Sequence, residues 1–359
     1  MTVQLESENH RKIREIGILA HRHFQATYNH VYSALRNMNG GRVMVVVGPS
    51  RVGKSELLRQ IISALRAEIR PRREDDQPIL LIEADLGNDA RMSLRQFEIE
   101  CLKNIRHPVF ANIGEDDEIP TKTRLSSSES ILRLLLLTSM KHRGTMYLFV
   151  DEAHHLLMTI REKLQSDILE ALKNLCNKSD VVLVLVGGYR LLDGLFQSAH
   201  FNGRMEIVHF PGYADVKEDL DDYASILASL ESVLPVSEPG LFVKNARKIR
   251  ELFWGAIGAT IDGIRAAESR RIARGAKVLE MLDVLSARLP DKAKKALLDD
   301  IKGGCEFFAR ELAKPDTKVT LTKEPSSEPD DAQVVSRKGK KKPFEKNPVR
   351  RTSPNVEVK

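Results

Sequence analysis

The sequence predicts an α/β fold in which a five-stranded parallel sheet is covered by helices on both faces and is followed by a smaller helical unit. Five short, near-continuous apolar runs alternate with segments of helical periodicity. Such alternation is typical of parallel strands that are buried on both faces. After Pro211 the strand signal stops, and the segments up to about residue 313 have helical periodicity.

The expected strands are RVMVVV, ILLIEA, MYLFVD, VVLVLVG and MEIVHF, at residues 42–47, 79–84, 146–151, 181–187 and 205–210. Helical periodicity between them spans residues 54–69, 93–105, 128–142 and 161–177. These patterns divide the chain into an N-terminal helical segment (1–40), an α/β core (41–212), a helical lid (213–313) and a basic tail (314–359).

Composition favours an ordinary globular protein, because 42% of the 359 residues are hydrophobic and 30% are charged. The N-terminus is charged without a long apolar stretch, which argues against a signal peptide. The longest apolar run, ILRLLLLTSM, contains Arg133 and is too short to cross a bilayer. Cys101, Cys176 and Cys305 are too dispersed for a disulfide framework or a metal site, and we interpret them as buried thiols. We therefore expect a cytoplasmic protein without a membrane segment.

The positive charge of the chain is concentrated in its tail. From Lys314 to Lys359 there are 12 basic and 7 acidic residues, which leaves only one unit of the net charge of +6 for the rest. Proline, serine and charged residues dominate this tail, so we expect it to be disordered. It could be a loose DNA tether, a docking peptide or a solubilising end.

A phosphate-binding loop follows the first expected strand. The pattern G-x-x-x-x-G-K-[ST] is matched in full by Gly48, Pro49, Ser50, Arg51, Val52, Gly53, Lys54 and Ser55. In such a loop the backbone N–H groups face the β-phosphate of a nucleotide, and Lys54 reaches the β and γ oxygens. The Ser55 hydroxyl is placed to ligate Mg²⁺. The sequence thus predicts binding of ATP with Mg²⁺.

The third expected strand ends in two acids within LFVDEAHH. Asp151 suits a direct or water-mediated hold on Mg²⁺, and Glu152 suits polarisation of the attacking water. His154 completes the tetrapeptide DEAH and is followed by His155, so the stretch could be part of a DEAH helicase box. Those helicases need a second RecA-like domain, and the helices expected after Pro211 leave no room for one. We therefore interpret His154 as a structural residue.

The loop GPSRVGKS, the strand LFVDEAHHL, the segment FNGRMEIVHFPGY and the lid stretch GAIGATIDGIRAAESRR together resemble the AAA+ ATPases. The likeness is closest to the transposition regulators TnsC, TniB and MuB and covers roughly residues 11–285. This resemblance implies an ATP-driven homo-oligomer, either a ring such as a hexamer or a helical filament, that surrounds duplex DNA. It further implies recruitment of a transposase, with the target chosen by a guide-RNA (CRISPR-associated) complex, a DNA-binding adaptor or neither.

By this resemblance Arg204, just before the last strand, would reach the γ-phosphate bound to a neighbouring subunit, although a surface arginine at a strand end fits the same position. Two departures from the family pattern argue for slow hydrolysis. The fourth strand ends in Gly187 and Gly188, where many members have a polar γ-phosphate sensor, and WGAIG lacks the arginine that many lids present to nucleotide.

The resemblance also places DNA contacts in the insertion after the second strand. Its basic residues are interrupted by the acidic stretch GEDDE. Cations that contact phosphates add salt-dependent affinity, although a charge run is more often a solvated face. The expected DNA contacts are some of Lys103, Lys122, Thr123 and Arg124.

Other functions of AAA+ ATPases stay open as alternative interpretations. A secretion or signalling ATPase usually carries a membrane helix or sensor domain, and neither is visible in the sequence. A replication initiator or helicase loader would be expected to carry a helix-turn-helix module or a helicase-binding N-terminal domain. A nucleotide-bound scaffold without catalysis stays open because the sensor residues are missing.

Overall fold

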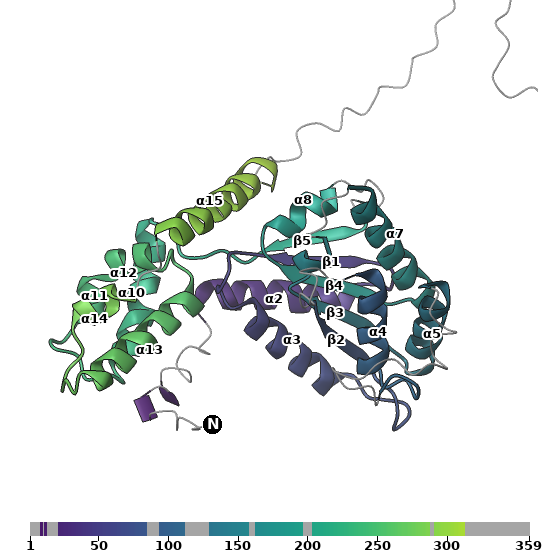
Figure 1. Cartoon of the computed structure of the whole chain (residues 1–359), viewed down its shortest axis with the longest axis horizontal. Coiled ribbons are helices and arrows are strands. Elements are labelled where there is room, and N and C mark those ends of the chain that lie inside the picture. The colour runs from purple at the N-terminus through teal and green to yellow at the C-terminus, as the bar shows by residue number, and fades with distance from the viewer. Residues whose placement is uncertain are drawn as a thin grey trace, which may run out of the picture. The chain divides into compact units, whose positions relative to one another are not determined.

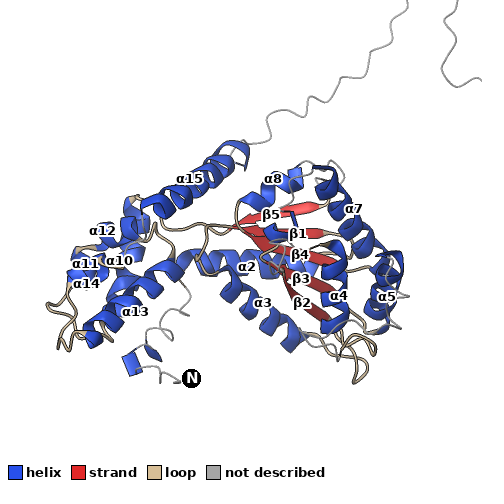
Figure 2. Cartoon of the chain, viewed as in Figure 1, coloured by secondary structure: helices blue, strands red, loops and turns tan. Residues whose placement is uncertain are grey.

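A computed structural model of the chain describes residues 8–9, 11–12, 21–84, 93–111, 129–157, 162–196, 203–287 and 291–312. All five expected strands are present: β1 (Val43–Val47), β2 (Ile79–Glu83), β3 (Tyr147–Asp151), β4 (Val182–Gly187) and β5 (Met205–His209). They form one parallel sheet in the order β2-β3-β4-β1-β5 (Figure 2). The predicted fold class is therefore confirmed.

Helices cover both faces of this sheet (Figure 1). One face carries α2 (Arg22–Asn37) and α3 (Lys54–Glu68), and the other carries α4 (Leu94–Asn104), α5 (Glu129–His142), α6 (His154–Leu157), α7 (Glu162–Ser179) and α8 (Arg190–Phe196). Alternate residues of β1 explain this arrangement. Val43, Val45 and Val47 pack into one core, while Met44 and Val46 pack into the other, as the period-two geometry of a strand requires.

Beyond Tyr213 the described chain is helical and builds a third core of its own. Its helices are α10 (Lys217–Glu231), α11 (Leu241–Lys244), α12 (Ala246–Leu252), α13 (Ile257–Ala273), α14 (Met281–Leu285) and α15 (Asp291–Phe307), and a π-helical turn follows at Phe308–Leu312. Phe242 and Trp254 are buried in this core, as are Tyr223 and Leu227 of α10. We call these helices the lid.

Charged pairs connect the lid to the α/β core. The guanidinium of Arg22, at the start of α2, pairs with Glu218, Asp219 and Asp222 on α10, the last at 2.6 Å. Asp219 also accepts the backbone N–H of Ala214 at 2.7 Å. This cluster fixes the start of the lid against the helix that precedes β1.

The three cysteines differ in their burial. Cys101 and Cys176 are buried as expected, but Cys305 is exposed on α15, where its sulfur lies 3.9 Å from the Tyr189 hydroxyl. Within the described ranges, no helix combines the length and the apolar character that a membrane span needs.

Gly263 gives a test of the packing in the lid. A Cβ at this position would lie 2.0 Å from the ring of Phe253, which is only 4% exposed. We expect Gly263→Ala to lower the free energy of unfolding by roughly 1–3 kcal/mol, because extra volume in a packed core forces side chains off their rotamers. Urea unfolding followed by circular dichroism measures this change.

Gly303→Ala is the matched control, since a Cβ there would meet nothing within 4 Å. In that helical position alanine should leave the unfolding midpoint unchanged or raise it slightly. Equal midpoints for Gly263→Ala and the unsubstituted protein would contradict the packing described for Phe253.

Candidate nucleotide site

The loop Gly48–Ser55 connects the end of β1 to the start of α3, and two of its glycines are required by geometry. A Cβ on Gly48 would lie 2.2 Å from the carbonyl oxygen of Phe210. Gly53 has φ 113° and ψ 20°, a left-handed conformation that favours glycine. Arg51 also has a positive φ, of 61°. The loop therefore curls tightly around the carboxyl end of β1.

The start of α3 has free backbone donors. Gly53 is its N-cap and provides no side-chain hydrogen bond. In the described part of the chain, the N–H groups of Lys54, Ser55 and Glu56 have no backbone acceptor. Unpaired N–H groups at the positive end of a 15-residue helix form an anion site. The geometry of the loop thus fits the phosphate that the sequence motif predicts.

Lys54 adds a positive charge inside this loop. Its side chain is 7% exposed, and Nζ donates to the carbonyl oxygens of Gly48 at 3.0 Å and Pro49 at 2.8 Å. Burial lowers the pKa of this ammonium, whereas the charges of Glu152, Asp151 and Asp300 act in the opposite direction. A buried cation that is balanced only by carbonyls and nearby acids is stabilised further by an anionic ligand.

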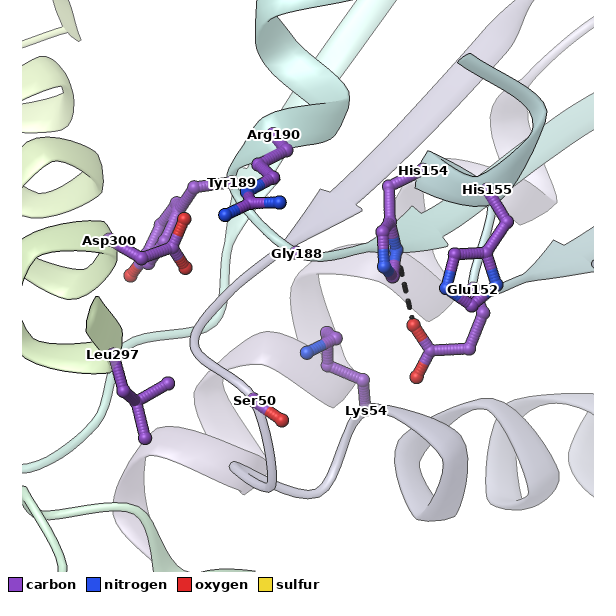
Figure 3. A pocket seen from close by; sticks show the side chains of 10 residues that line it. All are labelled: Ser50, Lys54, Glu152, His154, His155, Gly188, Tyr189, Arg190, Leu297 and Asp300. Carbon is purple, nitrogen blue, oxygen red and sulfur yellow. Dashed lines mark ion pairs between the residues drawn. The ribbon is translucent and has the colours of Figure 1, made fainter. Parts of the chain in front are cut away.

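Asp151 and Glu152 stand at the end of β3, as expected. Asp151 is 9% exposed, and its Oδ1 accepts the backbone N–H of Glu152 at 2.9 Å. Glu152 has φ 49°, a left-handed conformation that is costly for a residue with a side chain. Such strain is concentrated at functional sites. It directs the Glu152 carboxylate into the same cavity as Lys54 (Figure 3).

His154 differs from the structural role that the sequence suggested. Its Nδ1 lies 3.2 Å from Oε2 of Glu152, and its ring lines the cavity (Figure 3). Burial, followed by the charges of His155, Lys54 and Arg190, lowers its pKa to about 4, so the imidazole is neutral at pH 7. The neighbouring His155 donates from Nδ1 to the carbonyl oxygen of Ala84 at 2.7 Å and is the structural member of the pair.

These groups meet in a cavity of about 570 Å³. Its lining comprises Ser50, Lys54, Glu152, His154, His155, Gly188, Tyr189, Arg190, Leu297 and Asp300. Tyr189 and Arg190 follow β4, whereas Leu297 and Asp300 come from α15, more than 240 residues after Lys54. None of these four residues was predicted from the sequence. Tyr189 and Arg190 directly follow the fourth expected strand, but no local signal marks Asp300.

The residues present fit Mg²⁺ bound together with phosphate. Ser55 is exposed on the first turn of α3. Asp151 ends β3, which is separated from β1 by β4 in the sheet. Among the described residues no three His, Cys, Asp or Glu side chains are grouped so that they could hold a metal. One carboxylate and one hydroxyl suit Mg²⁺, which takes its other ligands from phosphate and water.

Arg204 lies at the opposite end of the sheet from this cavity. β1 and β5 pair in parallel with Val43 beside Met205, so Arg204 flanks the start of β1 while the phosphate loop follows its end. A five-residue strand separates the two ends by about 16 Å. The guanidinium of Arg204 is exposed and donates to Oδ1 of Asn177 at 2.7 Å. It is therefore placed away from the phosphate loop of its own subunit.

Of the four expected DNA-contacting residues, the structure describes Lys103. Its Nζ pairs with Oε1 of Glu100 at 3.0 Å, and its side chain is 21% exposed. Lys122, Thr123 and Arg124 lie outside the described residues.

Comparison with known proteins finds one family match. Residues 36–195 match the family described as AAA domain, and this span contains both the phosphate loop and the acids that end β3. No curated protein sequence matches the chain.

Several solved structures share the fold. The ORC1 protein of Aeropyrum pernix in complex with DNA has a TM-score of 0.55 and 14% identity, over 88% of this chain and 85% of that one. The ORC2 protein of Aeropyrum pernix gives a TM-score of 0.50 and 14% identity, over 74% of this chain and 66% of that one, just under two thirds of its length. The Drosophila ORC bound to DNA gives a TM-score of 0.50 and 16% identity, over 80% and 68%. The chain thus matches the AAA domain over residues 36–195 and shares the α/β fold of these structures.

Proposed function

We propose that the protein is an ATPase that assembles on duplex DNA and regulates DNA transposition. The observation that carries ATP hydrolysis is the convergence of Lys54, Glu152 and the free N–H groups of α3 on one cavity. In this proposal Lys54 and the loop N–H groups bind the β- and γ-phosphates. Ser55 and Asp151 hold Mg²⁺, which neutralises phosphate charge.

Glu152 is proposed to orient and polarise the attacking water, with His154 as its neighbour. Because the imidazole is neutral at pH 7, it contacts the Glu152 carboxylate at 3.2 Å without neutralising it as a cation would. That contact holds the carboxylate at one position in the cavity. This restraint favours slow hydrolysis, because the Glu152 carboxylate must also reach a water next to the γ-phosphate.

The position of Arg204 supports the proposed assembly. An exposed arginine at the edge of the sheet remote from its own phosphate loop suits contact with nucleotide on a neighbouring subunit. We therefore propose a ring, such as a hexamer, or a helical filament in which hydrolysis depends on assembly. The specific role in transposition, with a transposase and a targeting complex or adaptor as partners, rests on the likeness of the two motifs and the lid stretch to TnsC, TniB and MuB.

A replication-initiator role is the second candidate. Two of the similar structures favour it, because they are ORC proteins bound to DNA, although identities of 14–16% support the fold alone. Purified protein added to a transposition reaction with a purified transposase and to a binding assay with a replicative helicase distinguishes the two roles. ATP-dependent stimulation of strand transfer supports the transposition role, and its absence together with binding to a replicative helicase supports the initiator.

Lys54→Ala and Glu152→Gln test the assignment of the cavity. Lys54→Ala should weaken ATP binding by roughly 10- to 100-fold, since a hydrogen bond to a charged group contributes roughly 1.5–3 kcal/mol. Glu152→Gln should keep ATP affinity but lower kcat by roughly 100-fold or more, because it spares the phosphate contacts. Titration calorimetry and phosphate release measure the two effects. Glu170→Gln, an exposed acid on α7, is the matched control, and wild-type hydrolysis by Glu152→Gln would refute the role of Glu152.

Arg204→Ala should bind ATP as the unsubstituted protein does and lose the rise in ATPase rate with protein concentration on DNA. We expect a loss of about 1,000-fold in the assembled rate, the lower end for an arginine that acts in trans. Arg247→Ala, an arginine on the lid that is 74% exposed, should leave this rate unchanged. Electron micrographs that show only monomers with an ATP analogue and duplex DNA would rule out the assembly.

The double variant Lys122→Ala/Arg124→Ala should weaken duplex binding in a salt-dependent manner. The slope of log affinity against log salt should fall by about 2, because each lost phosphate contact removes about one released counterion. Lys103→Ala should change this slope less, since Glu100 already neutralises that lysine. Fluorescence anisotropy at several salt concentrations measures the slope, and an unchanged slope in the double variant would remove these residues from the DNA site.

A further inference from the structure

The last described helix, α15, contacts both cores of the protein. Leu297, Leu298 and Ile301 pack against the core of the lid. Phe307 packs against the core on the α7 face of the sheet, and Phe308 is part of that core. The helix therefore connects the lid to the α/β core directly and passes the nucleotide cavity between its two attachments.

Aromatic contacts define the attachment to the α/β core. Gly304 lies against the ring of Tyr189, where a Cβ would come within 2.3 Å of the ring atoms. Phe308 stacks on His209, with ring centroids 4.1 Å apart and an interplanar angle of 4°. The Tyr189 hydroxyl and Nε2 of His209 lie 2.8 Å apart and complete the cluster. The helix can approach this closely because position 304 has no side chain.

This docking carries an acid into the nucleotide cavity. Asp300 of α15 faces Arg190 and Lys54 across the cavity (Figure 3). Burial raises the pKa of the Asp300 carboxyl, while the positive charges of Arg190 and Lys54 lower it. In the described part of the chain, the side chains of Asp300 and Arg190 form no hydrogen bond and no ion pair within 4.0 Å. The arginine and the carboxylate thus line one cavity and interact with each other only through their charges.

Arg190 is the first charged side chain after β4. Gly187 and Gly188 bring no side chain to the cavity, and a Cβ on Gly187 would lie 3.3 Å from Nδ1 of His154. The guanidinium has planar donors that match a phosphate oxygen pair. Its position opposite Lys54 is where a phosphate held by the start of α3 would extend into the cavity.

We infer that Arg190 binds the γ-phosphate of ATP and that Asp300, carried by α15, competes with that phosphate for the cavity. The inference rests on the proposed function, since it requires ATP at this site. ADP has no γ-phosphate and leaves Asp300 opposite Arg190. ATP places a second anion there, so repulsion between like charges favours release of α15 from Tyr189 and His209. Nucleotide state and α15 docking are then coupled, and each affects the other to the same extent.

Nucleotide affinities of the full-length protein in Mg²⁺ test this inference. Arg190→Ala should weaken ATPγS binding by roughly 10-fold or more and change ADP binding by less than about 2-fold, because one charge-assisted contact is lost. Asp300→Asn should tighten ATPγS binding by about 3- to 10-fold with ADP unchanged. Asp299→Asn, on the exposed side of the same helix, is the control and should change neither. Retained ADP binding shows that each variant is folded.

A second pair of variants tests the docking of α15 without changing charge. Gly304→Ala should push the helix away from Tyr189 and tighten ATPγS binding as Asp300→Asn does, whereas Gly303→Ala has open space and should not. Amide hydrogen exchange in residues 297–308 should be faster with ATPγS than with ADP.

The outcomes separate this inference from the proposed function. If the unsubstituted protein binds neither nucleotide, the proposed function fails. If it binds both, and Arg190→Ala and Asp300→Asn keep its ratio of ATPγS to ADP affinity, the inference alone is overturned. Equal exchange of α15 in the two nucleotides would also overturn the competition.

Discussion

The buried ammonium of Lys54 is the constraint on which the rest of the site depends. Its position is fixed by the carbonyl groups of Gly48 and Pro49, and hence by the curl of the loop. That curl requires Gly48 to pass under the Phe210 carbonyl and Gly53 to be left-handed. Phe210 follows β5, which pairs with β1, so the register of the central strands determines where a phosphate can sit. A loss of register would move the loop away from the acids that end β3.

The lid meets this loop through its backbone. Gly258, in the first turn of α13, lies so close to Arg51 that a Cβ would be 2.4 Å from the Arg51 carbonyl oxygen. No side chain can occupy that position, so the lid cannot present an arginine to nucleotide there. Asp262 of the lid accepts from Arg51 of the loop at 2.5 Å. Arg190, the first residue of α8, is placed to provide a second cation for the phosphates.

Local sequence was sufficient to predict the strands and one wall of the cavity. Each strand except β5, which contains Glu206, is apolar up to its last residue. Lys54, Ser55, Asp151 and Glu152 lie at strand ends or helix starts that such runs define. The opposite wall depends on contacts between residues far apart in sequence. Asp300 enters the cavity only because Gly304 and Phe308 dock on Tyr189 and His209. The apolar periodicity of α15 does not indicate this docking. The same limit explains His154 and Cys305, because their burial depends on which helix packs beside them.

Charge balance explains how a cavity rich in acids can accept a polyanion. Lys54 and Arg190 face three carboxylates, those of Asp151, Glu152 and Asp300, while His154 is neutral at pH 7. The cavity alone therefore disfavours free nucleotide, and Mg²⁺ is needed to reverse the balance near Asp151. Asp300 is the one acid of the three that can leave, because it is held by a helix and not by a strand of the sheet. Separation of α15 from the core thus lowers the negative charge of the cavity without disturbing the residues that hold the metal or orient the water.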